Sequence, residues 1–215
     1  MKKHLTILLS LLFITSEANA RDGFYIGLDG LLVHAQHKLT GQSQDYTNTY
    51  TVDSTLKKVG GDSVGFGLNA GYKFGYEKFY IAPEAFFEQL NNKVNYDKLD
   101  GRPYIQDYIV LNYRYGVKAN LGYNINRDFA AFITYGAAMV DYDVRWAKGR
   151  IYPQKQYGDQ AISQTYGLGL LYNINDNWST KLGYDRQTAN VRYIYRGLNS
   201  RARIEIAKVG VIYNF

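Results

Sequence analysis

Apolar and polar residues alternate along the segment from Ile109 to Tyr123. The odd positions carry Ile, Leu, Tyr, Val and Ala, whereas the even positions after Val110 carry Asn, Arg, Gly and Lys. A period of two places these side chains on opposite faces of a β-strand, whereas a helix would scatter them around its circumference. The segment is therefore predicted to be a strand with one apolar and one polar face.

Seven further segments show the same period of two, although the apolar and polar faces are less distinct in the segment 129–139. Pro83 lies in the third strand and cannot donate a ladder hydrogen bond, so we expect a bulge there. The predicted strands are residues 24–29, 64–73, 79–88, 109–123, 129–139, 162–172, 178–185 and 207–215.

The connections between these strands alternate between short and long. The short ones lie near residues 75–77, 124–127 and 173–177, and the long ones are 39–62, 91–106, 144–160 and 190–203. Outer-membrane barrels alternate periplasmic turns and extracellular loops in this way. The prediction is an all-β fold, an eight-stranded antiparallel up-and-down transmembrane β-barrel with both termini beside the short turns.

The composition agrees with this fold. The chain has 22 Tyr and 21 Gly but only 3 Pro, and its mean hydropathy is −0.35. After residue 20 no segment offers the roughly 18 apolar residues that a transmembrane helix needs. A transmembrane barrel explains the low mean hydropathy, because apolar lipid-facing residues alternate with polar lumen-facing residues. A secreted soluble β-sandwich is the alternative, because it shares the alternation.

The first twenty residues have the organisation of a secretory signal peptide. A basic start is followed by an apolar run from Leu5 to Ile14 and by a small-x-small site at Ala18–Ala20. We expect residues 1–20 to be removed and residues 21–215 to form one barrel domain. The chain has no cysteine, so an exported form has neither disulfides nor a thiolate metal site.

Aromatic residues recur at the ends of the predicted strands next to the short turns. The motif Tyr-Asn-Ile-Asn occurs twice, and the chain finishes on Tyr-Asn-Phe. Amphipathic rings suit the boundary between lipid and water, and Asn is a common turn residue. The predicted interface residues are Tyr72, Phe79, Tyr123, Phe129, Tyr172, Trp178, Tyr213 and Phe215.

The polar faces of the strands carry charges of both signs into the predicted lumen. The candidates for a salt-bridge network are Asp29, Lys73, Glu84, Glu88, Arg114, Lys118, Lys181, Asp185 and Lys208. Buried charges need partners, and an eight-stranded barrel has room for side chains but hardly for a channel. A salt-bridged plug is one reading. A gated narrow pore is the other, since inward glycines leave space between the charges.

The eight strands and the C-terminal pattern Val209-x-Val211-x-Tyr213-x-Phe215 resemble the small outer-membrane β-barrel superfamily of Gram-negative bacteria. That superfamily includes opacity-type adhesins, the membrane domain of outer membrane protein A and related surface antigens. The resemblance implies an outer-membrane location, contact with lipid and lipopolysaccharide, and recognition of the Phe215 signal by the barrel-assembly machinery. It leaves the activity open among adhesion, packing, small pores and lipid enzymes.

The third and fourth long connections are rich in cations and aromatic residues. Their candidate ligand-binding residues are Arg145, Lys148, Arg150, Lys155, Arg192, Arg196, Arg201 and Arg203. Guanidinium groups bind phosphates and sulfates through forked contacts. The partner is either lipopolysaccharide of the same membrane or a ligand on a host surface. Nucleic acid is not expected in this compartment.

Three functions are therefore considered. The first is a non-catalytic surface protein that presents four extracellular loops in a structural or adhesin-like role, and the second is a small porin or gated pore. The third, a lipid A-modifying enzyme, would use His34 or His37 with Asp53-Ser54 or Asp62-Ser63. The His-x-Ser arrangement of the resembling deacylases is absent, however. The two histidines are three apart in a strand and face opposite ways, so no shared metal ion is expected. No catalytic residue and no cofactor is predicted.

Overall fold

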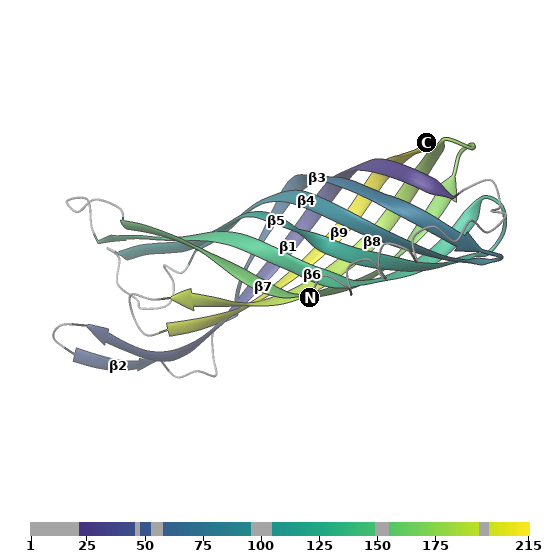
Figure 1. Cartoon of the computed structure of the whole chain (residues 1–215). Coiled ribbons are helices and arrows are strands. Elements are labelled where there is room, and N and C mark those ends of the chain that lie inside the picture. The colour runs from purple at the N-terminus through teal and green to yellow at the C-terminus, as the bar shows by residue number, and fades with distance from the viewer. Residues whose placement is uncertain (1–21, 46–47, 53–57, 96–104, 149–154, 194–197) are drawn as a thin grey trace, which may run out of the picture.

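The computed structural model describes residues 22–45, 48–52, 58–95, 105–148, 155–193 and 198–215 (Figure 1). The predicted signal peptide, residues 1–20, lies outside these ranges. The strands are β1 (Gly23–Asp45), β2 (Asn48–Val52), β3 (Lys58–Tyr76), β4 (Phe79–Asn95), β5 (Ile105–Asn124), β6 (Phe129–Lys148), β7 (Lys155–Asn173), β8 (Trp178–Tyr193) and β9 (Leu198–Asn214).

Eight of these strands form a closed antiparallel barrel. Each pairs with its neighbour in chain order from β3 to β9, and β1 closes the barrel by pairing with both β3 and β9. The short β2 pairs only with the far end of β1. Within the described ranges, no helix has the length and apolar character needed to span a membrane. The predicted eight-stranded up-and-down barrel is confirmed.

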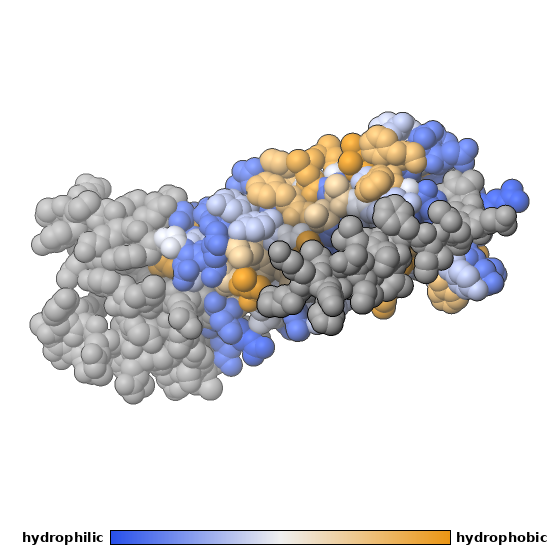
Figure 2. Space-filling model, in the orientation of Figure 1, coloured by the Kyte–Doolittle hydropathy of each residue, from blue (hydrophilic) through white to orange (hydrophobic). Residues whose placement is uncertain are grey.

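The barrel has two unlike ends. One end, called here the turn end, carries the short turns and the C-terminus, and the other, the extended end, carries the long strand extensions (Figure 1). A band of outward apolar side chains, the belt, surrounds the half nearer the turn end. Figure 2 shows this band with hydrophilic surface on either side of it. Its members include Phe24, Leu28, Leu32, Val64, Leu168 and Val209, each more than half exposed.

The predicted interface aromatics form a ring at the turn end of the belt. Phe79 pairs with Tyr123, Phe129 with Tyr172 and Trp178 with Tyr213 in the strand register. The ring centroids of these pairs lie 4.7 to 5.2 Å apart. Tyr72 contacts Phe24, and Phe215 contacts Tyr213. The structure therefore gathers all eight predicted aromatics at one level.

The two Tyr-Asn-Ile-Asn motifs form turns of the same design. Asn126 Oδ1 accepts the N–H groups of Asp128 and Phe129, and Asn175 Oδ1 accepts those of Asn177 and Trp178. The Asn directly after each belt tyrosine also donates its N–H to the preceding turn, at 2.7 Å. The repeated motif thus combines a belt residue with a self-capped turn.

The long connections were predicted as loops, except the first, for which a β-extension and a mobile segment were both considered. Strands take up most of residues 39–62, 144–160 and 190–203 and the two ends of residues 91–106. The strands continue far beyond the belt, so that β1 runs to Asp45, β6 to Lys148 and β8 to Tyr193. The cause is that the apolar side chains change from the outward face of a strand to its inward face above the belt. The sequence prediction did not follow this change. Leu31, Val33 and Ala35 point inward on β1, whereas His34 and Lys38 point outward. Above the belt, apolar residues fill the interior and polar residues face outward.

In the extended half the barrel separates into two four-stranded sheets. The β3–β4 pairing stops at Phe66↔Gln89 and the β7–β8 pairing stops at Thr165↔Gln187, while the other pairings continue. One sheet contains β8, β9, β1 and β3, and the other contains β4, β5, β6 and β7. Figure 1 shows the two groups diverging. Buried residues of both sheets form one apolar cluster, as in a β-sandwich.

Pro83 does not produce the predicted bulge. The β3–β4 register is the same on either side of it, at Gly71↔Glu84 and Phe74↔Ile81. The irregularities lie higher, between Gln89 and Asn92 on β4 and between Leu111 and Tyr113 on β5. Asn91 has a positive φ of 48° there. These bulges lie next to the last β3–β4 pair, beyond which β4 becomes the edge strand of its sheet.

Candidate functional site

The interior of the barrel consists of three layers. Next to the turn end is a cluster of Tyr25, Tyr80, Ala82, Ala130, Phe132 and Ile212. The middle layer is a network of charged residues. Above it lies the apolar cluster of the two sheets, which includes Leu31, Leu90, Ile109, Val140 and Ile204.

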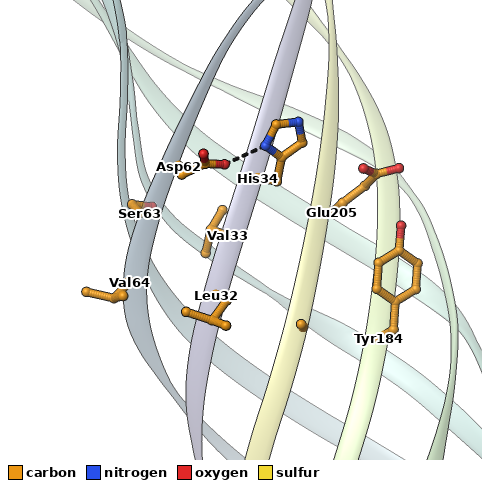
Figure 3. A pocket seen from close by; sticks show the side chains of 9 residues that line it. Leu32, Val33, His34, Asp62, Ser63, Val64, Tyr184 and Glu205 are labelled. Carbon is orange, nitrogen blue, oxygen red and sulfur yellow. Dashed lines mark hydrogen bonds and ion pairs between the residues drawn. The ribbon is translucent and has the colours of Figure 1, made fainter.

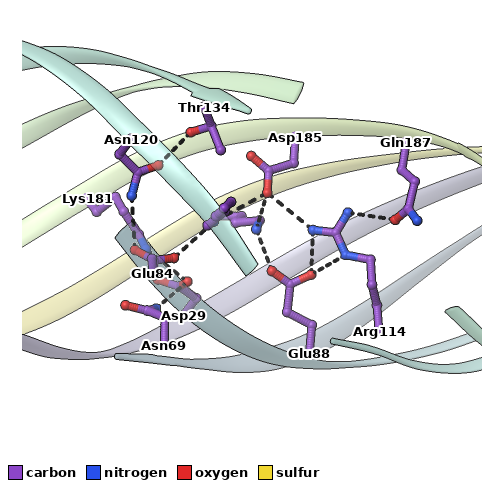
Figure 4. Close-up of polar contacts among 12 residues, drawn as sticks. Asp29, Asn69, Glu84, Glu88, Arg114, Asn120, Thr134, Lys181, Asp185 and Gln187 are labelled. Atoms are coloured by element: carbon purple, nitrogen blue, oxygen red, sulfur yellow. Dashed lines mark hydrogen bonds and ion pairs between the residues drawn. The ribbon is translucent and has the colours of Figure 1, made fainter. Parts of the chain in front are cut away.

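The charged layer is built on strand register. Glu84 is directly opposite Lys118, and Glu88 is directly opposite Arg114, on β4 and β5. Arg114 Nη2 lies 2.7 Å from Glu88 Oε2 and 3.2 Å from Asp185 Oδ2 (Figure 4). Lys208, from β9, contacts both of these carboxylates and so joins opposite sides of the barrel.

The network continues toward the turn end through Glu84. Its carboxylate lies 3.0 Å from Lys118 Nζ and accepts hydrogen bonds from Tyr25 and Asn120. A separate pair joins Lys181 to Asp29 at 3.1 Å, and Asn69 also donates to Asp29. All eight charged residues of this layer are buried. Four carboxylates face four cations, so the layer as a whole is neutral.

Aromatic contacts hold the network in place. The cationic groups of Arg114 and Lys118 each lie 5.1 Å from the centroid of Phe86, and that of Lys208 lies 5.7 Å from it. Three cations around one ring gain electrostatic stabilisation away from water. Lys73, the ninth predicted member, lies lower, with its ammonium group 4.4 Å from the ring centroid of Tyr80.

The pore hypothesis expected the inward glycines to leave open space between the charged side chains. In the structure they do not. A Cβ at Gly122 would overlap the ring of Tyr80, and a Cβ at Gly169 would overlap the ring of Phe132. The missing side chains make room for these inward aromatic rings. The glycines therefore allow the interior to be filled.

The predicted cationic ligand-binding residues are spread over several parts of the extended half. Arg150 and Arg196 lie outside the described residues. Arg145 and Lys148 belong to β6, Lys155 to β7 and Arg192 to β8, so they are strand residues rather than loop residues. Arg201 and Arg203 lie on β9 and are exposed on the outward face just above the belt.

A polar row crosses the barrel surface at the upper edge of the belt. The register aligns Arg186, Glu205, His34 and Asp62 on β8, β9, β1 and β3. His34 Nδ1 lies 2.5 Å from Asp62 Oδ1 (Figure 3). Gln36 Nε2 lies 3.0 Å from His34 Nε2. Sequence reasoning named His34 and Asp62 but did not show that they meet, because the contact depends on register.

The parts of the enzyme hypothesis do not assemble at this row. Ser63 follows Asp62 in the chain, but its hydroxyl donates to the carbonyl of Leu90, 2.7 Å away, on the side of the strand opposite His34. His37 points into the barrel, where it is wholly buried. Burial lowers its pKa to about 4, so it is neutral at physiological pH. The His34–Asp62 pair is therefore not joined by the serine or the second histidine of the hypothesis.

The comparison with protein families decides the identity of the fold. A family model described as the outer membrane protein beta-barrel domain matches residues 5–215. The chain belongs to this family. No curated protein matches the chain.

Solved structures agree with the family at the level of the fold. Neisserial surface protein A is 15% identical, with a TM-score of 0.51 over 90% of this chain and 97% of that one. OprG from Pseudomonas aeruginosa is 12% identical, with a TM-score of 0.51 over 91% and 97%. The outer membrane protease OmpT from Escherichia coli is 8% identical, with a TM-score of 0.53 over 94% and 99%.

As a member of this family, the chain combines an apolar belt with a filled interior. The neutral ion network and the two apolar layers account for most of the buried residues among those described. The outward polar row and the basic side chains above it are accessible at the surface. Among the described residues, charged side chains at and above the upper edge of the belt are therefore open to solvent.

Proposed function

We propose that this protein is a non-catalytic surface protein of the Gram-negative outer membrane. The barrel anchors it, with the turn end toward the periplasm and the extended end toward the exterior. The two-sheet extension presents the connecting segments for structural or adhesin-like interactions. The aromatic ring and the outward belt support this orientation, because short turns face the periplasm in such barrels.

The observation that carries the proposal is the three-layer interior. A pore needs a continuous polar path, but here a buried ion network lies between two apolar layers. Breaking buried ion pairs costs several kcal/mol, so a spontaneous opening of this layer is unfavourable. The filled lumen favours an anchor over the pore that was considered as the alternative.

The ligand of the extended end is proposed to be an anionic surface glycan. The supporting feature is the number of Arg and Lys residues in the extensions, including Lys155 and Arg192, since guanidinium and ammonium groups bind sulfates. Binding of the detergent-solubilised protein to sulfated heparin should weaken steeply with salt. Serine at Arg192 and Arg196 should reduce it, and serine at Lys78 and Arg127 of the turn end should not.

The absence of cysteine from the sequence allows a direct test of the orientation. Gln160→Cys places one thiol at an exposed position of the extended end, and Asp176→Cys places one at an exposed turn. A membrane-impermeant maleimide should label Gln160→Cys on intact cells and Asp176→Cys only after lysis. Labelling of Asp176→Cys alone on intact cells, or of neither variant before lysis, would contradict the proposal.

A further inference from the structure

The outward face of β8, β9, β1 and β3 changes from apolar to basic within four cross-strand rows. The strand register gives each row. From the belt upward, the rows are Tyr184, Ala207, Leu32 and Val64; then Arg186, Glu205, His34 and Asp62; then Thr188, Arg203, Gln36 and Gly60; then Asn190, Arg201 and Lys38.

A groove crosses the first two rows. Ala207 lies between Tyr184 and Leu32 in the register, and its small side chain is part of the lining of an open hollow of about 570 Å³. The lower part of the groove is lined by Leu32, Val64 and Ala207, and the upper part by His34, Asp62 and Glu205 (Figure 3). The groove is therefore apolar where it joins the belt and polar where the belt ends.

The carboxylates of the groove are engaged by neighbouring side chains. Glu205 Oε1 lies 3.8 Å from Arg186 Nε and 3.7 Å from Arg203 Nε. Asp62 is paired with His34. Each carboxylate is thus balanced by a basic side chain beside it.

The face as a whole is positively charged. Among its described side chains, the cations are Arg186, Arg201, Arg203 and Lys38, and the carboxylates are Asp62 and Glu205. Four positive charges less two negative charges leave +2 before any protonation of His34. Arg201 and Lys38 are exposed one row above Arg203 and Gln36. This charge lies next to the belt, at the depth where lipid headgroups meet water.

We propose that this face is a binding site for one phosphorylated lipid of the outer leaflet. An acyl chain lies in the groove over Ala207, between Leu32 and Tyr184. The phosphate is bound by Arg203, Arg201 and Lys38, above the His34–Asp62 pair. The inference rests on the proposed outer-membrane location. It commits to a membrane lipid because the groove is continuous with the belt and its charge complements a phosphate.

Native mass spectrometry of the protein in detergent tests the site. The probes are diphosphoryl lipid A, monophosphoryl lipid A and phosphatidylethanolamine, each titrated against the full set of variants. Ala207→Leu fills the groove without changing a charge, and Arg201→Gln with Arg203→Gln removes two cations. The matched controls are Ala137→Leu, another outward alanine of the upper belt, and Lys78→Gln with Arg127→Gln at the turn end.

Diphosphoryl lipid A should bind more tightly than the other probes. The affinity of the protein for diphosphoryl lipid A should fall about fivefold for each arginine replaced. Ala207→Leu should weaken all three lipids, and the controls should bind like the parent. Because lipid binding is measured in detergent and orientation by thiol labelling on cells, the two proposals fail separately.

Three results would overturn the proposal. One is equal binding of all probes by the parent and every variant. A second is weaker binding after the arginine changes while Ala207→Leu binds normally, which would leave an electrostatic surface without an acyl-chain groove. The third is loss of sulfated-heparin binding in the arginine variant with unchanged lipid binding, which would assign the face to a soluble glycan.

Discussion

Lys118 Nζ lies 3.0 Å from Glu84 Oε1, and both side chains are buried at the centre of the barrel. The pair is formed by residues directly opposite each other on β4 and β5. The same register places Arg114 opposite Glu88, two inward positions further from the turn end. Strand pairing alone therefore builds the first half of a neutral charged layer. Asp185 and Lys208 from β8 and β9, together with the Lys181–Asp29 pair, complete it.

Removal of one cation from this layer should destabilise the barrel strongly. Arg114→Met leaves Glu88 and Asp185 with one cation fewer, and an uncompensated buried charge costs about 3–5 kcal/mol. Urea unfolding of the protein in phospholipid vesicles measures the free energy. Adding Glu88→Gln restores neutrality and should recover part of the loss. A single variant as stable as the parent would contradict the role of the network.

The aromatic pairs of the turn end should contribute a coupling energy of their own. The rings of Phe129 and Tyr172 lie 4.7 Å apart between centroids. Such pairs contribute about 0.5–1.5 kcal/mol beyond the area that each ring buries. A double-mutant cycle with Phe129→Ala and Tyr172→Ala, measured by vesicle refolding, should give a coupling in this range. Strictly additive effects would show that the two rings act independently.

Acidification should loosen the extended half through His37. The pKa of the buried imidazole is lowered to about 4, below the usual value of about 6.5 that applies when the strand opens. Between these values the open state binds a proton and the closed state does not, so stability is complete above pH 6.5 and falls toward pH 4. The loss from pH 7 to pH 5 is on the order of 2 kcal/mol.

Hydrogen exchange of the β1 amides near His37 measures this opening. After correction for the intrinsic pH dependence of exchange, the parent should lose protection on acidification and His37→Leu should keep it. Parallel losses in the two proteins would show that another group is responsible.

The belt half of the fold was predictable from the sequence because its period-two pattern has a constant phase. Outward residues such as Leu121 and Leu168 are apolar, and their inward neighbours are polar, aromatic or glycine. The turns were predictable as well, since Asn126 and Asn175 recur at the same distance from a belt tyrosine. Both features are local, so one strand at a time was enough to recognise them.

The extended half was missed because its pattern has the opposite phase. The run from Arg201 to Glu205 alternates as regularly as any belt strand, but here Ala202 and Ile204 point inward and the charged residues point outward. Taken with the belt phase, the run suggested a basic loop. A reading that allowed the apolar face to change sides along one strand would have found Leu31, Val33 and Ile206.

The contacts of the outward face could not be predicted from one sequence. His34 and Asp62 are 28 residues apart, and their meeting depends on the β1–β3 register. The same holds for Arg186, which meets Glu205 from the neighbouring strand β8. The sequence supplied the residue types, and the register decided which of them became neighbours.

Single-channel recording in planar lipid bilayers tests the sealed interior most directly. The purified barrel should insert without discrete conductance steps at either polarity, while a porin prepared in the same detergent should give them. Reproducible steps from the parent protein, changed in size by Arg114→Met, would show that ions cross the charged layer. The protein would then be a pore, and the anchor proposed here would be wrong.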